Sequence, residues 1–438
     1  MAGELEPAGA ARALLALVAV RLTTPFAYLA VLGGLQVLLA SILHPLFGWW
    51  LAALLGGLWL LLLAALALLR DRWNLKLAAV SLLALVSAVA PTVTAMVLRS
   101  RIGLRSEHDG LLQIESAIDR LLRGEPIYGV DWSATQMATF PWALTPGPNP
   151  ALHHMAYYPL TVLVGVPFRL AMTALGLAFD YRIVLVAFTL LALGAILALP
   201  IEPQRRFMVI TAMLLSPLIT LYLWPGRNDM EFLACVFLVL ALLGRGHISS
   251  AAVALGVGMA LKPFAWLALP FLALVLYLRW RAGHSTRELA LSLLALGAAP
   301  LLTIVPFFLA NPAAFWSDTV LYATGGIPDA YPIAGYGFGE LLYERGLIAH
   351  RTDVFPFGLF QLAAMLPLLW FTARAFLGRP TIGRWMGGYA CLLLAFTFFA
   401  RFFNDNYAGV VISLLLCVLP LGGRWLVALP RQRESLAA

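Results

Sequence analysis

Charged residues are scarce in this chain. Asp, Glu, Lys and Arg together make up 11% of its 438 residues, whereas 62% are hydrophobic. A soluble domain carries about 25% charged residues, so the composition excludes an ordinary soluble protein. No segment shows the alternating polar and apolar pattern of a barrel strand, which favours helices as the spanning elements. The sequence therefore predicts an all-α polytopic membrane protein.

Cysteine is rare as well. Cys235, Cys391 and Cys417 are the three cysteines, and all fall within apolar segments. Their placement indicates neither a disulfide framework nor a metal site. No internal repeat and no cleavable signal pattern is recognisable, so the first apolar segment is predicted to act as an uncleaved anchor.

Long apolar runs are what the chain has in place of charge. A helix needs about 20 mainly apolar residues to cross a bilayer. Twelve segments are predicted to span the membrane: 24–43, 50–69, 77–98, 183–200, 207–223, 230–243, 248–262, 264–278, 289–309, 356–373, 385–401 and 406–422.

A thirteenth apolar stretch, 156–177, decides the topology, because every later loop would change sides if it spanned. If it does not span, the loops on one side contain 17 of the 29 Lys and Arg residues but 6 of the 21 acidic residues. This asymmetry is the one expected of a cytoplasmic side. We therefore predict that 156–177 is a re-entrant or interfacial helix on the outer side, with both termini cytoplasmic. The net charge of +8 then reflects contact with anionic lipids at the inner leaflet, not nucleic-acid binding.

The outer loop 99–155 contains an amphipathic helix near 110–123, predicted to lie on the bilayer and preceded by Asp109. Two interpretations of Asp109 remain open. Its carboxylate caps the free amides at the start of the helix, or it acts as a general base at the membrane surface.

Two further outer turns combine cations with carboxylates. Arg227, Asn228 and Asp229 lie between the spans 207–223 and 230–243, and Lys262 ends another span. The turn is either a solvated surface ion pair or part of a site facing Asp109. Lys262 either extends to the lipid headgroups or binds a phosphate.

The last outer turn contains Arg401, Asn404, Asp405 and Tyr407. It is either a hairpin whose polar groups satisfy one another, or a site in which Arg401 binds phosphate and Asn404 or Tyr407 contacts a sugar. The second long outer loop, 310–355, interleaves aromatic residues with glycine. This composition suits either stacking on sugar rings or an interfacial aromatic belt.

Several short motifs, in order, resemble those of a known family. Asp109 precedes a helix that ends in Gly124-x-Pro126-x-Tyr128, and Tyr158-Pro159-Leu160 begins the next helix. Asn228-Asp229 and Leu261-Lys262-Pro263 follow. The layout resembles the C-type (GT-C) integral membrane glycosyltransferases. It is most similar to the family 87 polyprenyl-phosphate-mannose-dependent mannosyltransferases.

The resemblance implies a GT-C-like catalytic domain over 77–422, a two-helix addition over 1–76 and a cytoplasmic tail over 423–438. It implies transfer of a hexose, which is mannose in the family 87 enzymes, from a polyprenyl-phosphate donor to a hydroxyl of a glycan or glycolipid acceptor. The site would lie on the outer face of the cell membrane, within reach of membrane lipids. The residues implied as catalytic are Asp109 and Asp229, and those implied to bind substrate are Lys262, Arg227, Asn228, Arg401, Asn404, Tyr407 and Tyr158. No metal ligand is assigned, although Asp109 with Asp229 is compatible with a divalent ion.

Two other functions remain open at this stage. A transporter or lipid flippase predicts charges at mid-span, discontinuous helices and paired inverted repeats, and the sequence contains few such charges. A scaffold of an envelope-assembly complex requires no clustered acids, so Asp109, Asp229 and Asp405 count against it.

Overall fold

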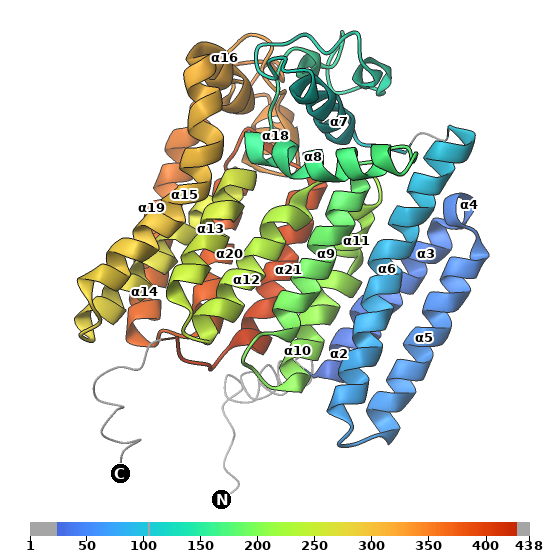
Figure 1. Cartoon of the computed structure of the whole chain (residues 1–438), viewed down its shortest axis with the longest axis vertical. Coiled ribbons are helices and arrows are strands. Elements are labelled where there is room, and N and C mark those ends of the chain that lie inside the picture. Colours follow the sequence, from blue (N-terminus) through green and yellow to red (C-terminus); the bar gives the residue numbers. More distant parts are fainter. Residues whose placement is uncertain (1–23, 104–105, 427–438) are drawn as a thin grey trace, which may run out of the picture.

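The chain folds into a bundle of helices. The computed structural model describes residues 24–103 and 106–426, and it is about 74% helical with almost no strands. The predicted all-α class is therefore confirmed. Figure 1 shows the long helices running side by side, with shorter helices gathered over one end of the bundle. Most of the predicted tail 423–438 lies outside the described residues, as do Arg12, Arg21, Arg431 and Arg433.

Six helical segments are long and apolar enough to cross a membrane, and they make the chain a helical membrane protein. They are Pro25–Ile42 (α2, Pro25–Tyr28; η1, Leu29–Gly33; α3, Gly34–Ile42), Trp49–Leu68 (α5), Trp73–Ile102 (α6), Pro263–Arg281 (η5, Pro263–Ala268; α14, Leu269–Arg281), Thr286–Ala310 (α15) and Phe357–Gly378 (α19). A bent pair of helices provides a seventh if it is counted as one span.

The bend of that pair has a local cause. Pro203–Leu215 (α10, Pro203–Ile210; η4, Thr211–Leu215) and Pro217–Leu223 (α11) meet at 41°. Pro217 lacks a backbone N–H and cannot continue the preceding helix. Ser216 is extended, and its hydroxyl accepts a hydrogen bond from the amide of Leu218 at 3.3 Å, so a new helix begins there.

The prediction of twelve spans is not confirmed. The other predicted spans correspond to helices of 14 to 17 residues, shorter than the roughly 20 residues of a full crossing. They are Arg182–Leu197 (α9), Asp229–Gly244 (α12), Ile248–Leu261 (α13), Ile382–Phe398 (α20) and Asp405–Leu421 (α21). α12 is buried along nearly its whole length and packs against α9 and α13. Its apolar composition therefore reflects the protein core as much as contact with lipid.

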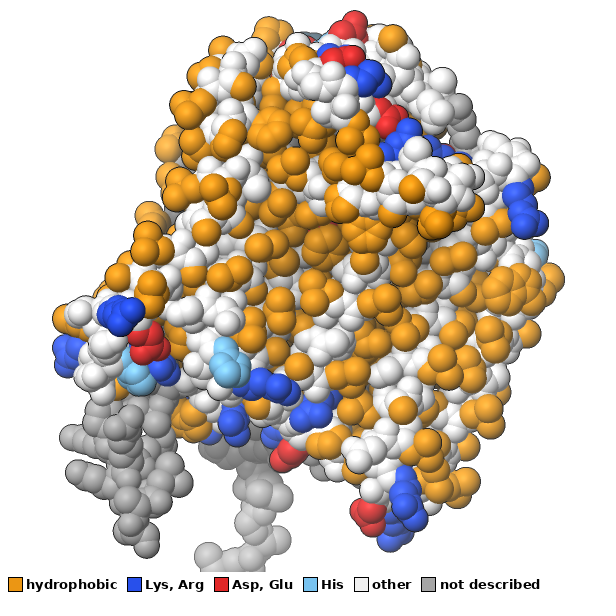
Figure 2. Space-filling model, in the orientation of Figure 1, with side chains coloured by type: hydrophobic (Ala, Val, Ile, Leu, Met, Phe, Trp, Pro, Cys, Tyr) orange, Lys and Arg blue, Asp and Glu red, His pale blue; other side chains and the backbone are white. Residues whose placement is uncertain are grey.

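The surface divides into zones. In Figure 2 a broad belt of hydrophobic side chains covers the middle of the molecule. Basic side chains predominate at the end where α5 turns into α6, and acidic and basic side chains mix at the opposite end. The turns after α5, α9, α12 and α14 all lie at the basic end (Figure 1). The loops thus sort onto two ends, as the sequence predicted.

Short elements cover the opposite end. From the first long loop come Asp109–Leu122 (α7), Gln136–Thr139 (η2), Pro150–Leu152 (η3) and Pro159–Ala174 (α8). From the second long loop come Pro312–Trp316 (α16), Ser317–Leu321 (η6), Tyr322–Thr324 (α17), Ala334–Gly335 (β1) and Phe338–Glu344 (α18). The turn after α20 adds Phe402–Phe403 (β2). β1 and β2 pair in parallel, with Ala334 opposite Phe402. His44–Phe47 (α4) also lies near this end (Figure 1).

α8 lies across the ends of the bundle helices (Figure 1), and the interfacial placement of 156–177 stays a prediction. α7 differs from its prediction. Its apolar residues, including Leu111, Ile114 and Ile118, are buried, and the helix packs on α8, with Arg169 donating to Asp119 at 2.9 Å. Protein, not bilayer, thus covers the apolar face of α7.

The two N-terminal spans pack directly on the rest of the bundle. The Tyr28 hydroxyl donates to the carbonyl of Leu416 at 2.6 Å, and the Thr220 hydroxyl donates to Gln36 at 2.7 Å. Both Tyr28 and Gln36 are buried. These contacts fix α2 and α3 against α21 and α11.

Candidate functional site

Polar residues at the ends of three helices meet beneath α7 and α8. Asp229 begins α12, Lys262 follows the last residue of α13, and Asn406 lies in the first turn of α21. Lys262 Nζ lies 2.5 Å from Asp229 Oδ1, and the Asn406 amide donates to Asp229 Oδ2 at 2.5 Å. Lys262 also donates to Asn228 Oδ1 at 3.1 Å. The Asp229 carboxylate is therefore buried and paired on both oxygens.

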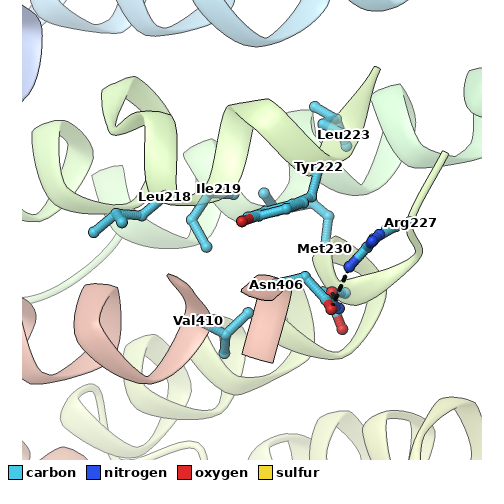
Figure 3. A pocket seen from close by; sticks show the side chains of 9 residues that line it. Leu218, Ile219, Tyr222, Leu223, Arg227, Met230, Asn406 and Val410 are labelled. Atoms are coloured by element: carbon cyan, nitrogen blue, oxygen red, sulfur yellow. Dashed lines mark hydrogen bonds between the residues drawn. The ribbon is translucent and has the colours of Figure 1, made fainter. Parts of the chain in front are cut away.

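Arg227 extends this network toward α21. Its Nη1 donates to Asp405 Oδ1 and to Asn406 Oδ1, both at 2.6 Å, and its guanidinium lies 5.1 Å from the centre of the Tyr222 ring. Figure 3 shows Arg227 and Asn406 facing one another. Two cations, Arg227 and Lys262, thus flank the Asn406–Asp229 pair. The structure brings together Arg227, Asn228, Asp229 and Lys262, which the sequence had placed in two separate turns.

A narrow crevice between α11 and α21 leads to these residues. Apolar side chains, among them Leu218, Ile219 and Val410, line it together with Tyr222, and Arg227, Asp229 and Asn406 contribute its polar part (Figure 3). Its free volume of about 10 Å³ corresponds to a single water. Leu218 and Tyr222 are partly exposed, so the crevice reaches the surface of the bundle. The crevice therefore runs from apolar side chains on the flank of the bundle to the Arg227 guanidinium.

Asp109 is the first residue of α7 and is buried. Its Oδ1 accepts from the amide of Gly110 at 2.7 Å and lies 2.8 Å from His108 Nδ1, and its Oδ2 accepts from Asn149 at 2.9 Å. Burial alone raises the pKa of this carboxyl, but His108, Asn149 and the Gly110 amide together outweigh burial and lower the pKa to about 2. Asp109 is therefore a carboxylate at neutral pH, and it takes part in capping α7 together with His108.

Direct contacts place Asp109 beside the Arg227 turn. The His108 amide donates to the carbonyl of Pro225 at 2.7 Å. Gly226 has a φ of +94°, and a Cβ there would lie 2.2 Å from Leu111 of α7. The turn that carries Arg227 thus packs tightly against the first turn of the helix that begins with Asp109.

Tyr157 lies between the two carboxylates. A Cβ added to Gly110 would lie 1.8 Å from its hydroxyl. Burial first, and then the charges of Asp109 and Asp229 among other neighbours, raise the pKa of Tyr157 well above 10. The family resemblance implied its neighbour Tyr158, which is the N-terminal flanking residue of α8. The Tyr157–Tyr158–Pro159 run was the signal, but it did not reveal which ring faces α7.

The other predicted sugar contacts lie on the same side. Asn404 flanks the start of α21 and lies within hydrogen-bonding reach of the Tyr331 side chain. Tyr407 packs edge-on against Phe264 at 4.9 Å, and its ring centre lies 5.9 Å from Lys262 Nζ. Tyr407 therefore borders the Asp229–Lys262 pair, whereas the side-chain contact of Asn404 is with Tyr331.

Arg401 has other partners than the predicted phosphate. It is buried, and its guanidinium donates to the backbone carbonyls of Tyr331, of Asp353 at 2.7 Å and of Arg351 at 2.9 Å. These carbonyls belong to the second long loop, which Arg401 holds against the start of α21. The geometry does not support the phosphate contact, and we leave Arg401 out of the site.

A buried ionic cluster that the sequence analysis missed holds α7 in place. Arg99, near the end of α6, lies 2.7 Å from Glu107, 2.7 Å from Glu115 and 3.1 Å from Asp180. Arg182 pairs with Asp180 at 2.6 Å and donates to the carbonyl of Trp224 at 3.0 Å. The cluster thus fixes α7 to the turn that carries Arg227. Its members come from separate outer segments, so no local spacing marked it.

The two implied catalytic acids do not fit a divalent ion as they are placed. Both oxygens of Asp229 accept from Lys262 and Asn406, and the Lys262 ammonium occupies the position beside the carboxylate that a cation would need. Within residues 24–103 and 106–426, no group of three or more His, Cys, Asp or Glu side chains has a metal-binding arrangement. We derive no step through a metal.

No known protein family, curated protein or solved structure gives a significant match to this chain.

Proposed function

We propose that this protein is a membrane glycosyltransferase that moves a hexose from a polyprenyl-phosphate donor to an acceptor hydroxyl. One observation carries the proposal. Asp109, Arg227 and Lys262 come together at one end of the bundle, where an apolar crevice leads to Arg227 and to Asp229, the partner of Lys262. A prenyl-linked donor has matching chemistry, because an apolar chain is joined to an anionic headgroup.

The cations account for departure of the lipid phosphate. Breaking the bond between the sugar C1 and the phosphate oxygen leaves an electron pair on that oxygen. Arg227 and Lys262 stabilise this developing charge, since preorganised positive groups act strongly at a water-poor site. Asp405 and Asp229 hold the two cations in place beforehand. The phosphate enters as an additional acceptor of their hydrogen bonds.

Asp109 is proposed as the general base. The acceptor oxygen forms a bond to C1 as its proton passes to the Asp109 carboxylate, and the configuration at C1 inverts. General-base catalysis contributes about 10²–10⁴-fold. With a pKa near 2, Asp109 accepts the proton late, when attack on C1 has already acidified the acceptor hydroxyl. Asp229 then serves to orient Lys262 instead of acting as a second base.

The location follows from charge. We place the site on the outer face of the cell membrane with both termini cytoplasmic, because basic residues predominate at the opposite end of the bundle. The crevice between α11 and α21 is narrow, so the proposal requires it to widen for an isoprenoid chain. α11 begins at the break before Pro217, where the backbone hydrogen-bonding pattern is already interrupted.

The same break favours a second candidate, a transporter or flippase for a prenyl-linked lipid. Discontinuous helices are typical of transporters, and the 41° bend lies at the start of the crevice-lining helix.

Reconstitution in lipid vesicles separates these functions. The purified protein is supplied with radiolabelled polyprenyl-phosphate mannose, octyl mannoside and a glycolipid extract. Label appearing in a mannosylated product supports the transferase. Movement of intact donor across the bilayer without transfer supports the transporter, and the absence of both supports a scaffold.

A further inference from the structure

One buried hydroxyl near Asp109 has no hydrogen-bond partner among the residues that the structure describes. Tyr322 begins α17 and is 3% exposed, and its hydroxyl makes no hydrogen bond to any described residue. Most buried polar side chains in proteins have at least one hydrogen-bond partner. Because an unpaired buried hydroxyl destabilises the fold, its presence calls for an explanation.

The ring of Tyr322 is held firmly. It packs on His154 with 4.9 Å between ring centres and on Tyr331 at 6.1 Å, and its carbonyl accepts from the Tyr331 amide at 2.9 Å. His154 is fixed in turn, with 2.9 Å contacts to Asp318 and to Asp329. These contacts hold the hydroxyl at a buried position.

The segment that supports Tyr322 also contacts Asp109. Asn149 donates to Asp109, and five residues later the carbonyl of His154 accepts from Gln113 of α7 at 2.8 Å. The segment 149–154 therefore contacts Asp109 through Asn149 at one end and Tyr322 through His154 at the other. In agreement, Asp109 and Tyr157 are close enough to raise the pKa of Tyr322, after the larger effect of burial.

We propose that Tyr322 binds the acceptor, by donating its hydroxyl hydrogen to a hydroxyl group of a sugar or polyol whose reacting hydroxyl faces Asp109. The inference rests on the proposed function and adds a residue that recognises the acceptor. A polyhydroxylated acceptor provides two neighbouring hydroxyls, one for Asp109 and one for Tyr322. An apolar acceptor would leave the Tyr322 hydroxyl unpaired.

Tyr322→Phe tests this, because it removes the hydroxyl and leaves the ring. The matched control is Tyr28→Phe, which removes a buried hydroxyl that does have a partner, the carbonyl of Leu416, far from Asp109 in the fold. Transfer is measured with radiolabelled polyprenyl-phosphate mannose and octyl mannoside, with a glycolipid extract as the alternative acceptor. The thermal midpoint is recorded for each variant.

We expect Tyr322→Phe to keep or raise the thermal midpoint, because no hydrogen bond is lost, and to lower kcat/KM for the acceptor by about tenfold. The KM for the donor should not change. Tyr28→Phe should lower the midpoint and leave both KM values unchanged.

Three outcomes overturn the inference. Acceptor kinetics of Tyr322→Phe equal to those of the wild type overturn it while the proposed function stands. A loss of stability as large as that of Tyr28→Phe, with both KM values altered, assigns Tyr322 a structural role instead. Absence of transfer by the wild-type protein to either acceptor overturns the proposed function, and this inference with it.

Discussion

The backbone amide of His108 donates a hydrogen bond to the carbonyl of Pro225 at 2.7 Å. This bond joins the residue before Asp109 to the turn before Arg227, although the two are more than a hundred positions apart in the sequence. A backbone hydrogen bond therefore helps to set the distance between the Asp109 carboxylate and the Arg227 guanidinium. The tight packing of Gly226 on Leu111 reinforces that spacing.

The first prediction concerns this packing. Gly226→Ala introduces a Cβ 2.2 Å from Leu111, at a φ of +94°. Gly246→Ala is the matched control, since Gly246 has a φ of +82° and open space around the added Cβ. Both variants incur the backbone strain of about 1–3 kcal/mol, but Gly226→Ala alone should displace α7. We expect it to lower transfer well below that of Gly246→Ala, with partial recovery in Leu111→Ala/Gly226→Ala. Equal activity of the two glycine variants would contradict this.

The second prediction concerns Asp109→Asn, which keeps the shape of the side chain and removes the base. We expect transfer to fall by about 10²–10⁴-fold, while circular dichroism and the thermal midpoint show a folded protein. Normal turnover would falsify the assignment of the base.

The low pKa of Asp109 adds a pH dependence with a definite sign. A carboxyl whose folded pKa is lowered to about 2 stabilises the protein fully above its unfolded value near 3.9, and this contribution is lost as pH falls toward 2. Asp109 should therefore cause no acidic decline in transfer above about pH 4. A fall in the wild-type thermal midpoint between pH 7 and about pH 4 that disappears in Asp109→Asn would contradict the lowered pKa.

A third prediction separates the structural and chemical roles of Lys262. Lys262→Met leaves the buried Asp229 carboxylate without its cation, which costs about 3–5 kcal/mol for a broken buried pair. The double variant Lys262→Met/Asp229→Asn removes both charges and should recover most of that stability. Transfer should stay low in both variants, because the phosphate still lacks the Lys262 ammonium. Recovery of transfer together with stability would show that Lys262 acts on folding alone.

A fourth prediction concerns His154. Burial lowers the pKa of this imidazole, but hydrogen bonds to Asp318 and Asp329 and their charges outweigh burial and raise it above 6.5. A raised folded pKa means that the stabilisation is fully present below the unfolded value and is lost as pH rises through the folded one. The wild-type thermal midpoint should therefore fall as pH rises above the unfolded value of about 6.5. His154→Gln should flatten this dependence, and an unchanged slope would argue against the contacts with the two aspartates.

The sequence was informative where one residue type or one apolar run determines the structure. The low charge predicted membrane helices, and the distribution of Arg separated the loops onto two ends of the bundle. The motif around Asp109 correctly placed the start of α7, within one residue. These features depend on local composition, which a single sequence displays directly.

Features that depend on contacts between distant segments could not be predicted from local composition. Arg401 stands in a turn rich in polar residues, yet its partners are carbonyls that lie 48 to 70 positions away. Tyr157 and Tyr158 are adjacent, and the packing of α7 determines which of them lies near Asp109. The apolar runs at α12 and α13 mark buried helices shorter than a full crossing, because hydrophobicity does not distinguish a protein neighbour from lipid.

The fastening of the second long loop by Arg401 limits how this end of the molecule can open. A loop can move as a unit only if its middle is not bonded to the rest of the protein. Here the buried Arg401 guanidinium donates hydrogen bonds to the backbone carbonyls of Tyr331, Arg351 and Asp353. Lifting the loop would require breaking those bonds together, as in local unfolding. Under the proposed function, a lipid-borne donor would therefore enter sideways, between α11 and α21. We then expect the rate at which these two helices separate to limit the rate of turnover.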